Sequence, residues 1–320
     1  MEILPPKPSQ STRENAAPCV GIAGRSPIFY GPDGLRAGWS IVLYIAVLAV
    51  LLVLSRFELR WFAVHLQQKS NQGGNDFHPA FAIVAESTVL LVIVLATAFM
   101  ALLEHRRVAV YGLDGADRVR QFFIGLVSGF CFLSLLVGIL VATHHLILSS
   151  AHLPAKQTVA YAAAWAFCFF LVGMTEEFGL RGYLLFTLAR GIRFWPAAIV
   201  LAALFGFMHK GNHGESPFGL IAAALIALVF SLSLWRLGHL WWAIGFHMSW
   251  DWAESYFYGT ADSGVVSAGR LMHAQPAGNI LLSGGITGPE GSAWILLVVI
   301  LAALFVWKTQ PFRGIRLTEK

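Results

Sequence analysis

The sequence predicts an all-α fold, a polytopic transmembrane helical bundle with about eight spans. The first observation is the composition: of the 320 residues, 57% are hydrophobic and 12% are charged, with a mean hydropathy of +0.67. Soluble domains carry about 25% charged residues, so this chain lies far outside their range. The second observation is that apolar runs of helical length recur along the chain. About 20 such residues cross the hydrocarbon core of a bilayer, which makes each run a candidate span.

The apolar runs follow one another along the whole chain. Several are long enough for a crossing, and two or three are short. An even number of spans places both ends of the chain on one side of the membrane. The eight runs cover residues 37–55, 79–103, 122–141, 160–175, 195–208, 218–235, 240–252 and 293–307.

These runs define one domain with a tail at each end. No internal repeat, heptad pattern or soluble domain of appreciable size separates them, so we expect a single bundle over residues 37–307. Residues 1–36 are rich in proline and contain neither the apolar segment nor the cleavage site of a signal peptide, which predicts a disordered cytoplasmic tail. Residues 308–320 are expected to form a second cytoplasmic tail.

The positive charges predict the orientation. With the N-terminus inside, 16 of the 22 lysine and arginine residues fall in inner segments and six in outer segments, and such an excess marks the cytoplasmic side. We therefore expect both termini in the cytoplasm. The expected location is a bacterial inner membrane, with the protein integral to it. The net charge of +5 is spread over these segments, which argues against a nucleic-acid partner.

The longest irregular stretch, residues 258–292, contains eight glycines and two prolines. A loop of this length is usually functional or disordered. Its glycines lack the Lys-Ser/Thr pair of a phosphate loop, and no strand precedes them, so we expect no nucleotide partner. A re-entrant lid or a folded outer loop is the expected structure.

Ionisable residues inside apolar runs cost about 2.5–3.5 kcal/mol each on insertion scales and are functional candidates by default. The first group is Glu176 and Glu177 with Arg181. Glu177 and Arg181 lie four residues apart and can pair on one helix face, whereas Glu176 points about 100° away. A carboxylate left without that partner suits a group that takes and returns protons. A structural salt bridge between Glu177 and Arg181 is an equally good interpretation.

Two further groups contain histidine. His209 ends the sequence Phe-Gly-Phe-Met-His, and a single histidine there is more often an interfacial or core residue than a ligand. His247 and Asp251 lie four residues apart in another run, so the imidazole and the carboxylate share one helix face. A local hydrogen-bonded pair explains them equally well. Glu86, inside the second run, has no partner that the sequence can name, and its role stays open.

Membrane depth links the three groups. If the fourth helix continues to about Ala189, Glu176 lies about 20 Å above its inner end. His209 and His247 lie about 21 Å and 16 Å above the inner ends of their own helices. The three groups would then meet at one level of the membrane. A helix that stopped at Arg181 would break this cluster.

The three groups resemble the motifs of the CPBP family of intramembrane proteases. This family includes the type II CAAX prenyl endopeptidases and bacterial bacteriocin-processing or immunity proteins, and its pattern is EExxxR, then FxxxH, then HxxxN or HxxxD on successive helices. The similarity covers about residues 160–252 and implies a protease-like core there. The pattern is met by Glu176-Glu177 with Arg181, by Phe205 with His209, and by His247 with Asp251.

The resemblance implies hydrolysis of a peptide bond in a peptide or protein substrate, within or beside the membrane lipid. Glu176 would activate the attacking water, and Glu177 and Arg181 would belong to the same catalytic site. His209, His247 and Asp251 would bind a divalent metal, with zinc as the candidate. In a metal-free alternative they would position the water and stabilise the oxyanion. Asp251 stands where the eukaryotic branch has asparagine, and because a carboxylate is the better metal ligand, the metal-assisted route is favoured.

The competing hypotheses are not catalytic. A transporter or membrane scaffold could use the same buried groups as bridges between helices. A pseudo-enzyme could act as an immunity or partner-binding protein, although the intact motifs argue against it. The chain shows no paired halves with matching broken segments, which argues against a transporter.

Overall fold

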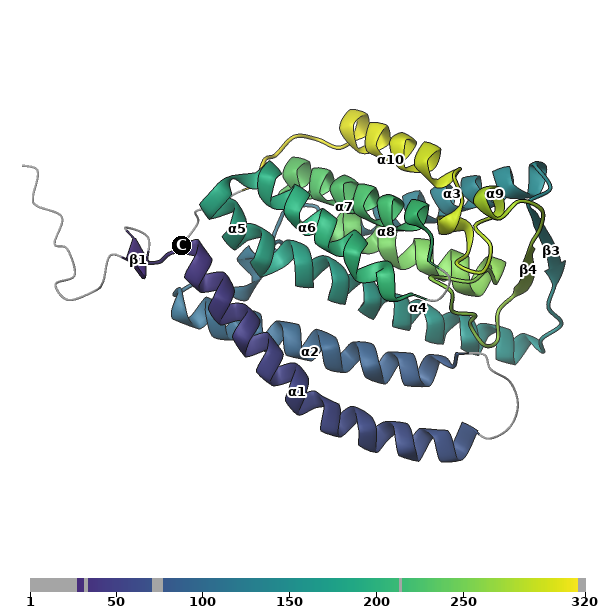
Figure 1. The fold of residues 1–320 in the computed structure, drawn as a ribbon, viewed down its shortest axis with the longest axis horizontal. Helices are drawn as coiled ribbons and strands as arrows, with labels where there is room; N and C mark the ends of the chain where they lie inside the picture. Colours follow the sequence, from purple (N-terminus) through teal and green to yellow (C-terminus); the bar gives the residue numbers. More distant parts are fainter. Residues whose placement is uncertain (1–27, 32–33, 71–76, 213–214, 316–320) are drawn as a thin grey trace, which may run out of the picture.

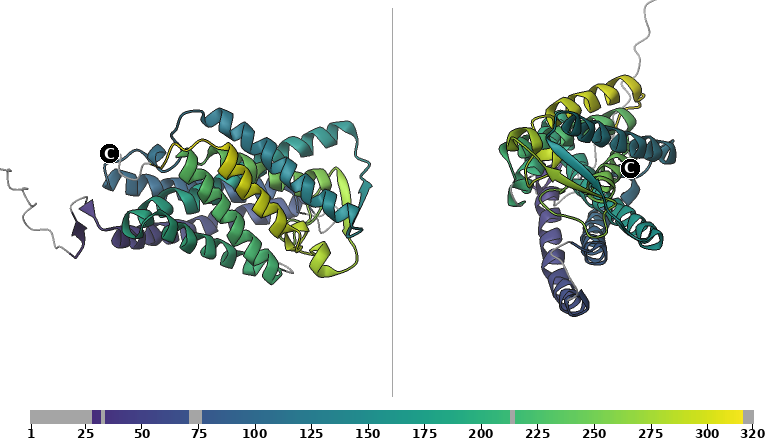
Figure 2. Two further views of the ribbon diagram at one scale, coloured as in Figure 1. Left: turned by 90° about the horizontal axis from the view of Figure 1, so that it is seen from above. Right: turned by 90° about the vertical axis from the view of Figure 1, so that its right-hand side faces the viewer.

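The computed structural model describes residues 28–31, 34–70, 77–212 and 215–315. Over these residues the protein is a bundle of helices (Figure 1), and Figure 2 shows it from two further directions. Each apolar run corresponds to a helical segment, which confirms the predicted all-α fold. The segments are α1 (Ala37–Ser70), α2 (Pro79–Leu103), α3 (Arg118–Ala142), α4 (Ala155–Gly179) continued by the π-helical η2 (Leu180–Leu184) and α5 (Leu185–Ile192), α6 (Phe194–Met208), α7 (Pro217–Leu237), α8 (Trp241–Asp251) continued by the π-helical η4 (Trp252–Tyr258), and α10 (Ile295–Thr309).

Within the described residues, six segments are long and apolar enough to cross a bilayer, with Ala155–Ile192 counted as one. The chain is therefore an integral membrane protein. The remaining two runs form the 11-residue α8, which η4 lengthens, and the 15-residue α10. The helical segment that carries Glu176 continues past Arg181 as far as Ile192, as predicted, but it consists of two helices joined at a kink at Gly182 rather than one straight helix.

The start of α1 and the end of α10 lie at the same end of the bundle (Figure 1). Most of the predicted N-terminal tail, residues 1–27 and 32–33, falls outside the described residues, as do residues 316–320 of the C-terminal tail. At the end of the N-terminal tail, β1 (Tyr30–Gly31) pairs with β2 (Gly34–Leu35) in antiparallel fashion. The disorder of the N-terminal tail and the cytoplasmic location of both tails stay predictions.

The glycine-rich stretch after Tyr258 is a folded loop at the opposite end of the bundle (Figure 1). Its strand β4 (Met272–Pro276) pairs antiparallel with β3 (Leu146–Ser150), with Leu146 opposite Pro276. The short α9 (Ile280–Ser283) and the 3-10 turn η5 (Pro289–Gly291) follow. The stretch is therefore folded, and its re-entrant or outer location stays a prediction.

Helices α3 and α8 run parallel in direct backbone contact because glycines of α3 face α8. A Cβ atom at Gly125 would lie 2.2 Å from the carbonyl oxygen of Trp242, and one at Gly129 would lie 2.2 Å from that of Phe246. Small residues let helix backbones approach closely in a membrane, where packing rather than water exclusion drives helix association. These contacts fix the height of α8 along the bundle.

A further glycine places α4 against α8. A Cβ atom at Gly173 would lie 3.1 Å from the carbonyl oxygen of Ile244 and 3.6 Å from the Cβ of His247. Glu177 follows Gly173 by one helical turn. The close approach therefore brings the carboxylate of Glu177 to the level of His247.

The fourth helix changes geometry directly after the two glutamates. Gly182, within η2, has non-helical backbone angles (φ −80°, ψ −120°). A Cβ atom there would lie 2.8 Å from the ring of Phe178, so a side chain at this position would clash. Single π-helical turns inside α-helices are frequent at functional sites.

We expect Gly129→Ala to destabilise the bundle by about 1–3 kcal/mol, because the added methyl group overpacks the contact between α3 and α8. Gly138→Ala is the matched control in the same helix: nothing lies within 4 Å of its Cβ position. That change is expected to be neutral or stabilising by up to about 1 kcal/mol. Thermal unfolding of the purified protein in detergent compares the two, and equal melting temperatures would contradict the role of Gly129.

Candidate active site

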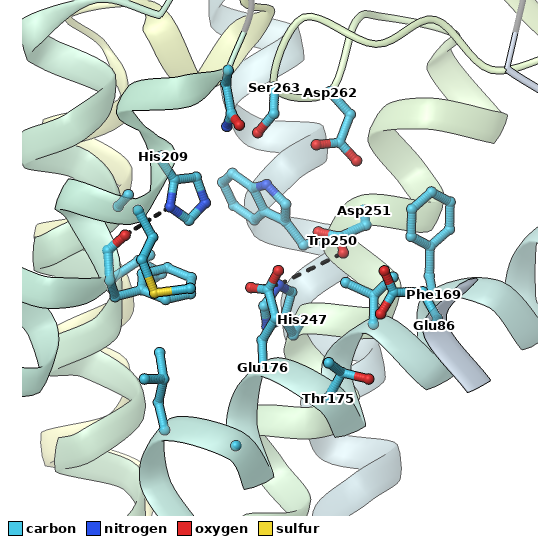
Figure 3. Close-up of a pocket in the computed structure, with 18 of the residues that line it drawn as sticks. Glu86, Phe169, Thr175, Glu176, His209, His247, Trp250, Asp251, Asp262 and Ser263 are labelled. Carbon is cyan, nitrogen blue, oxygen red and sulfur yellow. Dashed lines mark hydrogen bonds and ion pairs between the residues drawn. The ribbon is translucent and has the colours of Figure 1, made fainter. Parts of the chain in front are cut away.

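One cavity of about 730 Å³ lies inside the bundle (Figure 3). Its wall is largely apolar, and α4, α8 and the turn directly after α6 each contribute polar residues to it. Glu177 and Arg181 lie buried behind this wall. The predicted site residues that line the cavity are Glu176, His209, His247 and Asp251.

Glu177 and Arg181 form the predicted ion pair, with 2.7 Å between Oε2 and Nη1. Their side chains are 0% and 3% exposed, so the pair is sealed from solvent. The Nε of Arg181 donates to the carbonyl of Ala227 on α7 at 3.3 Å. Its guanidinium also lies 5.4 Å and 5.3 Å from the ring centroids of Phe205 and Phe230. The carboxylate and the two ring faces compensate for the water that the buried guanidinium has lost.

His247 stands among three carboxylates. Its Nδ1 donates to Oε1 of Glu177 at 3.0 Å. Its Nε2 lies 3.5 Å from Oε2 of Glu176 and 3.6 Å from Oδ2 of Asp251. The acid of the fourth span and the imidazole of α8 therefore meet in the cavity, as the depth argument predicts.

The two adjacent glutamates occupy different environments. The Glu176 side chain is 35% exposed, whereas that of Glu177 is fully buried. This difference follows from the helix, which turns consecutive residues by about 100°. Glu176 is therefore the glutamate of this pair that can reach water or a substrate in the cavity.

His209 faces the cavity from the end of α6 (Figure 3). Its Nδ1 donates to the carbonyl oxygen of Phe205, one turn earlier, at 2.8 Å, and the two rings lie 4.6 Å apart. Because a carbonyl oxygen only accepts, Nδ1 carries the proton and Nε2 is left for the cavity. The Phe-x-x-x-His spacing thus sets the orientation of the imidazole. His209 lies across the cavity from His247 (Figure 3).

The predicted metal ligands fit zinc by their chemistry but not by their spacing. His209 and His247 each have Nδ1 bonded to an oxygen acceptor, which is typical of histidines that bind metal through Nε2. Their ligand atoms do not, however, all lie within 4.8 Å of one another across His209, His247 and Asp251. Among the described residues, the group that does so is formed by Glu254, Asp262 and Glu290.

Four acidic residues of the cavity, Glu86, Glu215, Asp262 and Glu290, were not assigned to the site from the sequence. Glu86 of α2 lines the same cavity as Glu176; its place in an apolar run was the signal, but its neighbours became visible only in the structure. Asp262 and Glu290 come from the glycine-rich loop and also line the cavity. Burial raises the pKa of Asp262. Burial, followed by the charge of Asp262, raises the pKa of Glu290 to about 7.

The motif residues of the cavity lie in a segment that is similar to known proteins. Residues 157–253 match the family model of type II CAAX prenyl endopeptidase Rce1-like proteins. The match confirms the resemblance that the motifs indicate, over a segment that begins in α4 and ends in η4. The matched family is a protease family of the membrane-embedded, CAAX-protease type. No curated protein matches the chain.

We expect Arg181→Met to destabilise the protein by about 3–5 kcal/mol, because it leaves the buried Glu177 carboxylate without its cation. The double variant Glu177→Gln with Arg181→Met should lose less than the sum of the single variants, by about 0.5–3 kcal/mol. Thermal or denaturant unfolding in detergent measures each value.

Arg107→Met is the matched control for this cycle. Its pair with Asp114 is solvent-exposed, with side chains 77% and 49% accessible, so its loss should cost less than about 1 kcal/mol. Additive effects in the double variant would show that the buried pair is not coupled.

Proposed function

We propose that the protein is an intramembrane endopeptidase that hydrolyses a peptide bond in a membrane-associated peptide or protein substrate. The observation that carries this proposal is the partly exposed Glu176 carboxylate, 3.5 Å from Nε2 of His247 inside a cavity of the bundle. The family match over residues 157–253 supports the hydrolase class.

In the proposed reaction Glu176 takes a proton from a water molecule while the water oxygen attacks the carbonyl carbon of the scissile bond. The charge that develops on the carbonyl oxygen is met by the Nε2–H of a doubly protonated His247. The neighbouring carboxylates of Glu177 and Asp251 favour that charge state. When the C–N bond breaks, Glu176 returns the proton to the leaving amine.

The remaining site residues position the reacting groups. Arg181 holds Glu177, and Glu177 holds the imidazole of His247, so both are positioning residues. His209 presents Nε2 to the cavity, where it accepts a hydrogen bond that orients the water or the substrate amide.

We also propose where this site lies in the bundle and in the membrane. The proteolytic core occupies about residues 160–252 of a bundle over residues 37–307, in a bacterial inner membrane with both tails in the cytoplasm. The distribution of lysine and arginine supports this orientation. Helix α1 starts and α10 ends at the same end of the bundle, which is consistent with both tails lying on one side of the membrane (Figure 1).

We expect Glu176→Gln to lower the cleavage rate by about 10²–10⁴-fold, the usual contribution of a general base, with an unchanged melting temperature. The assay is mass spectrometry of new termini in a library of membrane-anchored peptides reconstituted with the protein in liposomes. Glu86→Gln is the matched control, since it makes the same change in the same cavity and should retain most of the activity.

A scaffold, transporter or immunity protein gives a different result in this assay. The wild-type protein would then cleave nothing, and Glu176→Gln would change the melting temperature or leave every property intact. Equal loss of cleavage in Glu86→Gln and Glu176→Gln would contradict the assignment of Glu176 as the base.

The metal-assisted version of the mechanism is a separate proposal, with zinc as the candidate ion. In the structure His209, His247 and Asp251 are not arranged around one point, and the roles of Glu176 and His247 given above do not require an ion. If these three side chains coordinate an ion together, purified wild-type protein should contain about one equivalent of zinc, and the His209→Ala variant should contain none. Elemental analysis measures this content. Zinc-free protein that cleaves in the presence of a chelator would rule the metal out.

A further inference from the structure

A second polar cluster lies where the glycine-rich loop meets the end of α8. Glu254 belongs to η4, and Asp262 and Glu290 belong to the loop. One carboxylate oxygen from each lies within 4.8 Å of the other two. Glu254, Asp262 and Glu290 all follow the segment that matches the protease family, so none of them belongs to the three motifs, although Asp262 and Glu290 line the same cavity as the motif residues.

The local structure holds the backbone of Glu254 and the side chains of Asp262 and Glu290 in place. The backbone N–H and the hydroxyl of Thr260 both donate to the carbonyl of Glu254 at 3.0 Å. The hydroxyl of Ser255 donates to Asp262 at 3.0 Å. The indole Nε1 of Trp250 donates to Glu290 at 2.6 Å. The cluster is therefore fixed from both the helix and the loop.

Glu254 is the residue that these contacts leave unexplained. Its side chain is 0% exposed, and both carboxylate oxygens lack a hydrogen-bond partner in the structure. No described lysine or arginine forms an ion pair with Glu254, Asp262 or Glu290. A buried carboxylate aimed at two further carboxylates needs positive charge, which a bound cation or a proton can supply.

The donor set selects the kind of cation. Three carboxylates and no nitrogen or sulfur donor suit a hard divalent ion better than zinc. Oxygens on opposite sides of a calcium ion lie about 4.8 Å apart, because the Ca–O distance is about 2.4 Å. All three oxygens fall within that limit. Asp262 and Glu290 also line the cavity, from which water can complete the coordination.

We propose that Glu254, Asp262 and Glu290 form a binding site for a hard divalent cation, with calcium as the best fit. The ion would join η4, which continues the helix of His247 and Asp251, to both ends of the loop. It would thereby fix the loop as part of the cavity wall. This proposal does not depend on the hydrolase proposal, and either can fail alone.

Terbium is a luminescent substitute for calcium that is sensitised by a nearby tryptophan, and Trp250 contacts the cluster directly. Purified full-length protein in detergent should show saturable terbium emission on tryptophan excitation, displaced by calcium. Asp262→Asn and Glu290→Gln should each weaken binding at least about tenfold, since fewer charged ligands remain. Glu215→Gln, a cavity-lining loop residue outside the cluster, is the matched control and should bind normally.

A second measurement needs no cluster variant. Calcium should raise the melting temperature of the wild-type protein. Trp250→Phe should lose most of the sensitised emission but keep the calcium-dependent shift. Absence of saturable emission and of any shift would overturn the proposal and leave shared protons as the source of positive charge. Emission that survives Asp262→Asn and Glu290→Gln but disappears in Glu176→Gln or His209→Ala would also overturn it, because the ion would then lie at the motif residues.

Discussion

The rest of the site depends on the two interactions that the carboxylate of Glu177 makes. One of its oxygens binds Arg181 and the other binds His247, so a single buried group connects α4 to α8. Arg181 extends the connection to α7 through Ala227. A buried charge cannot be left unpaired without a large penalty. The three helices are therefore held in one arrangement, and the orientation of His247 follows from it.

The sequence predicts much of this arrangement because its spacings are local. Residues four apart on a helix face the same side, which accounts for the pairing of Glu177 with Arg181 and for the proximity of His247 to Asp251. The same rule gives the contact between His209 and Phe205. The depth argument assumes a straight helix; the fourth helical segment does continue to Ile192, but its kink at Gly182 means that helical rise alone does not set the depth of Glu176.

Contacts between distant segments could not be predicted in this way. The glycine-rich loop shows no periodic pattern, so nothing in the sequence indicates that β4 pairs with β3 or that Asp262 and Glu290 reach Glu254. The distance between His209 and the groups around His247 depends on how α6 packs against its neighbours. That packing is set by side chains far apart in the chain, and it decides whether the three predicted ligands can share an ion.

The backbone contact of α3 with α8 has a consequence for the evolution of this site. Helix α3 lies outside residues 157–253, yet it determines the height of the helix that carries His247 and Asp251. A chimera that transplanted only residues 157–253 into a foreign bundle would carry every motif residue without the partner that aligns them. Inheritance of the chemistry therefore requires co-inheritance of a neighbouring helix whose own sequence contains none of the reactive groups.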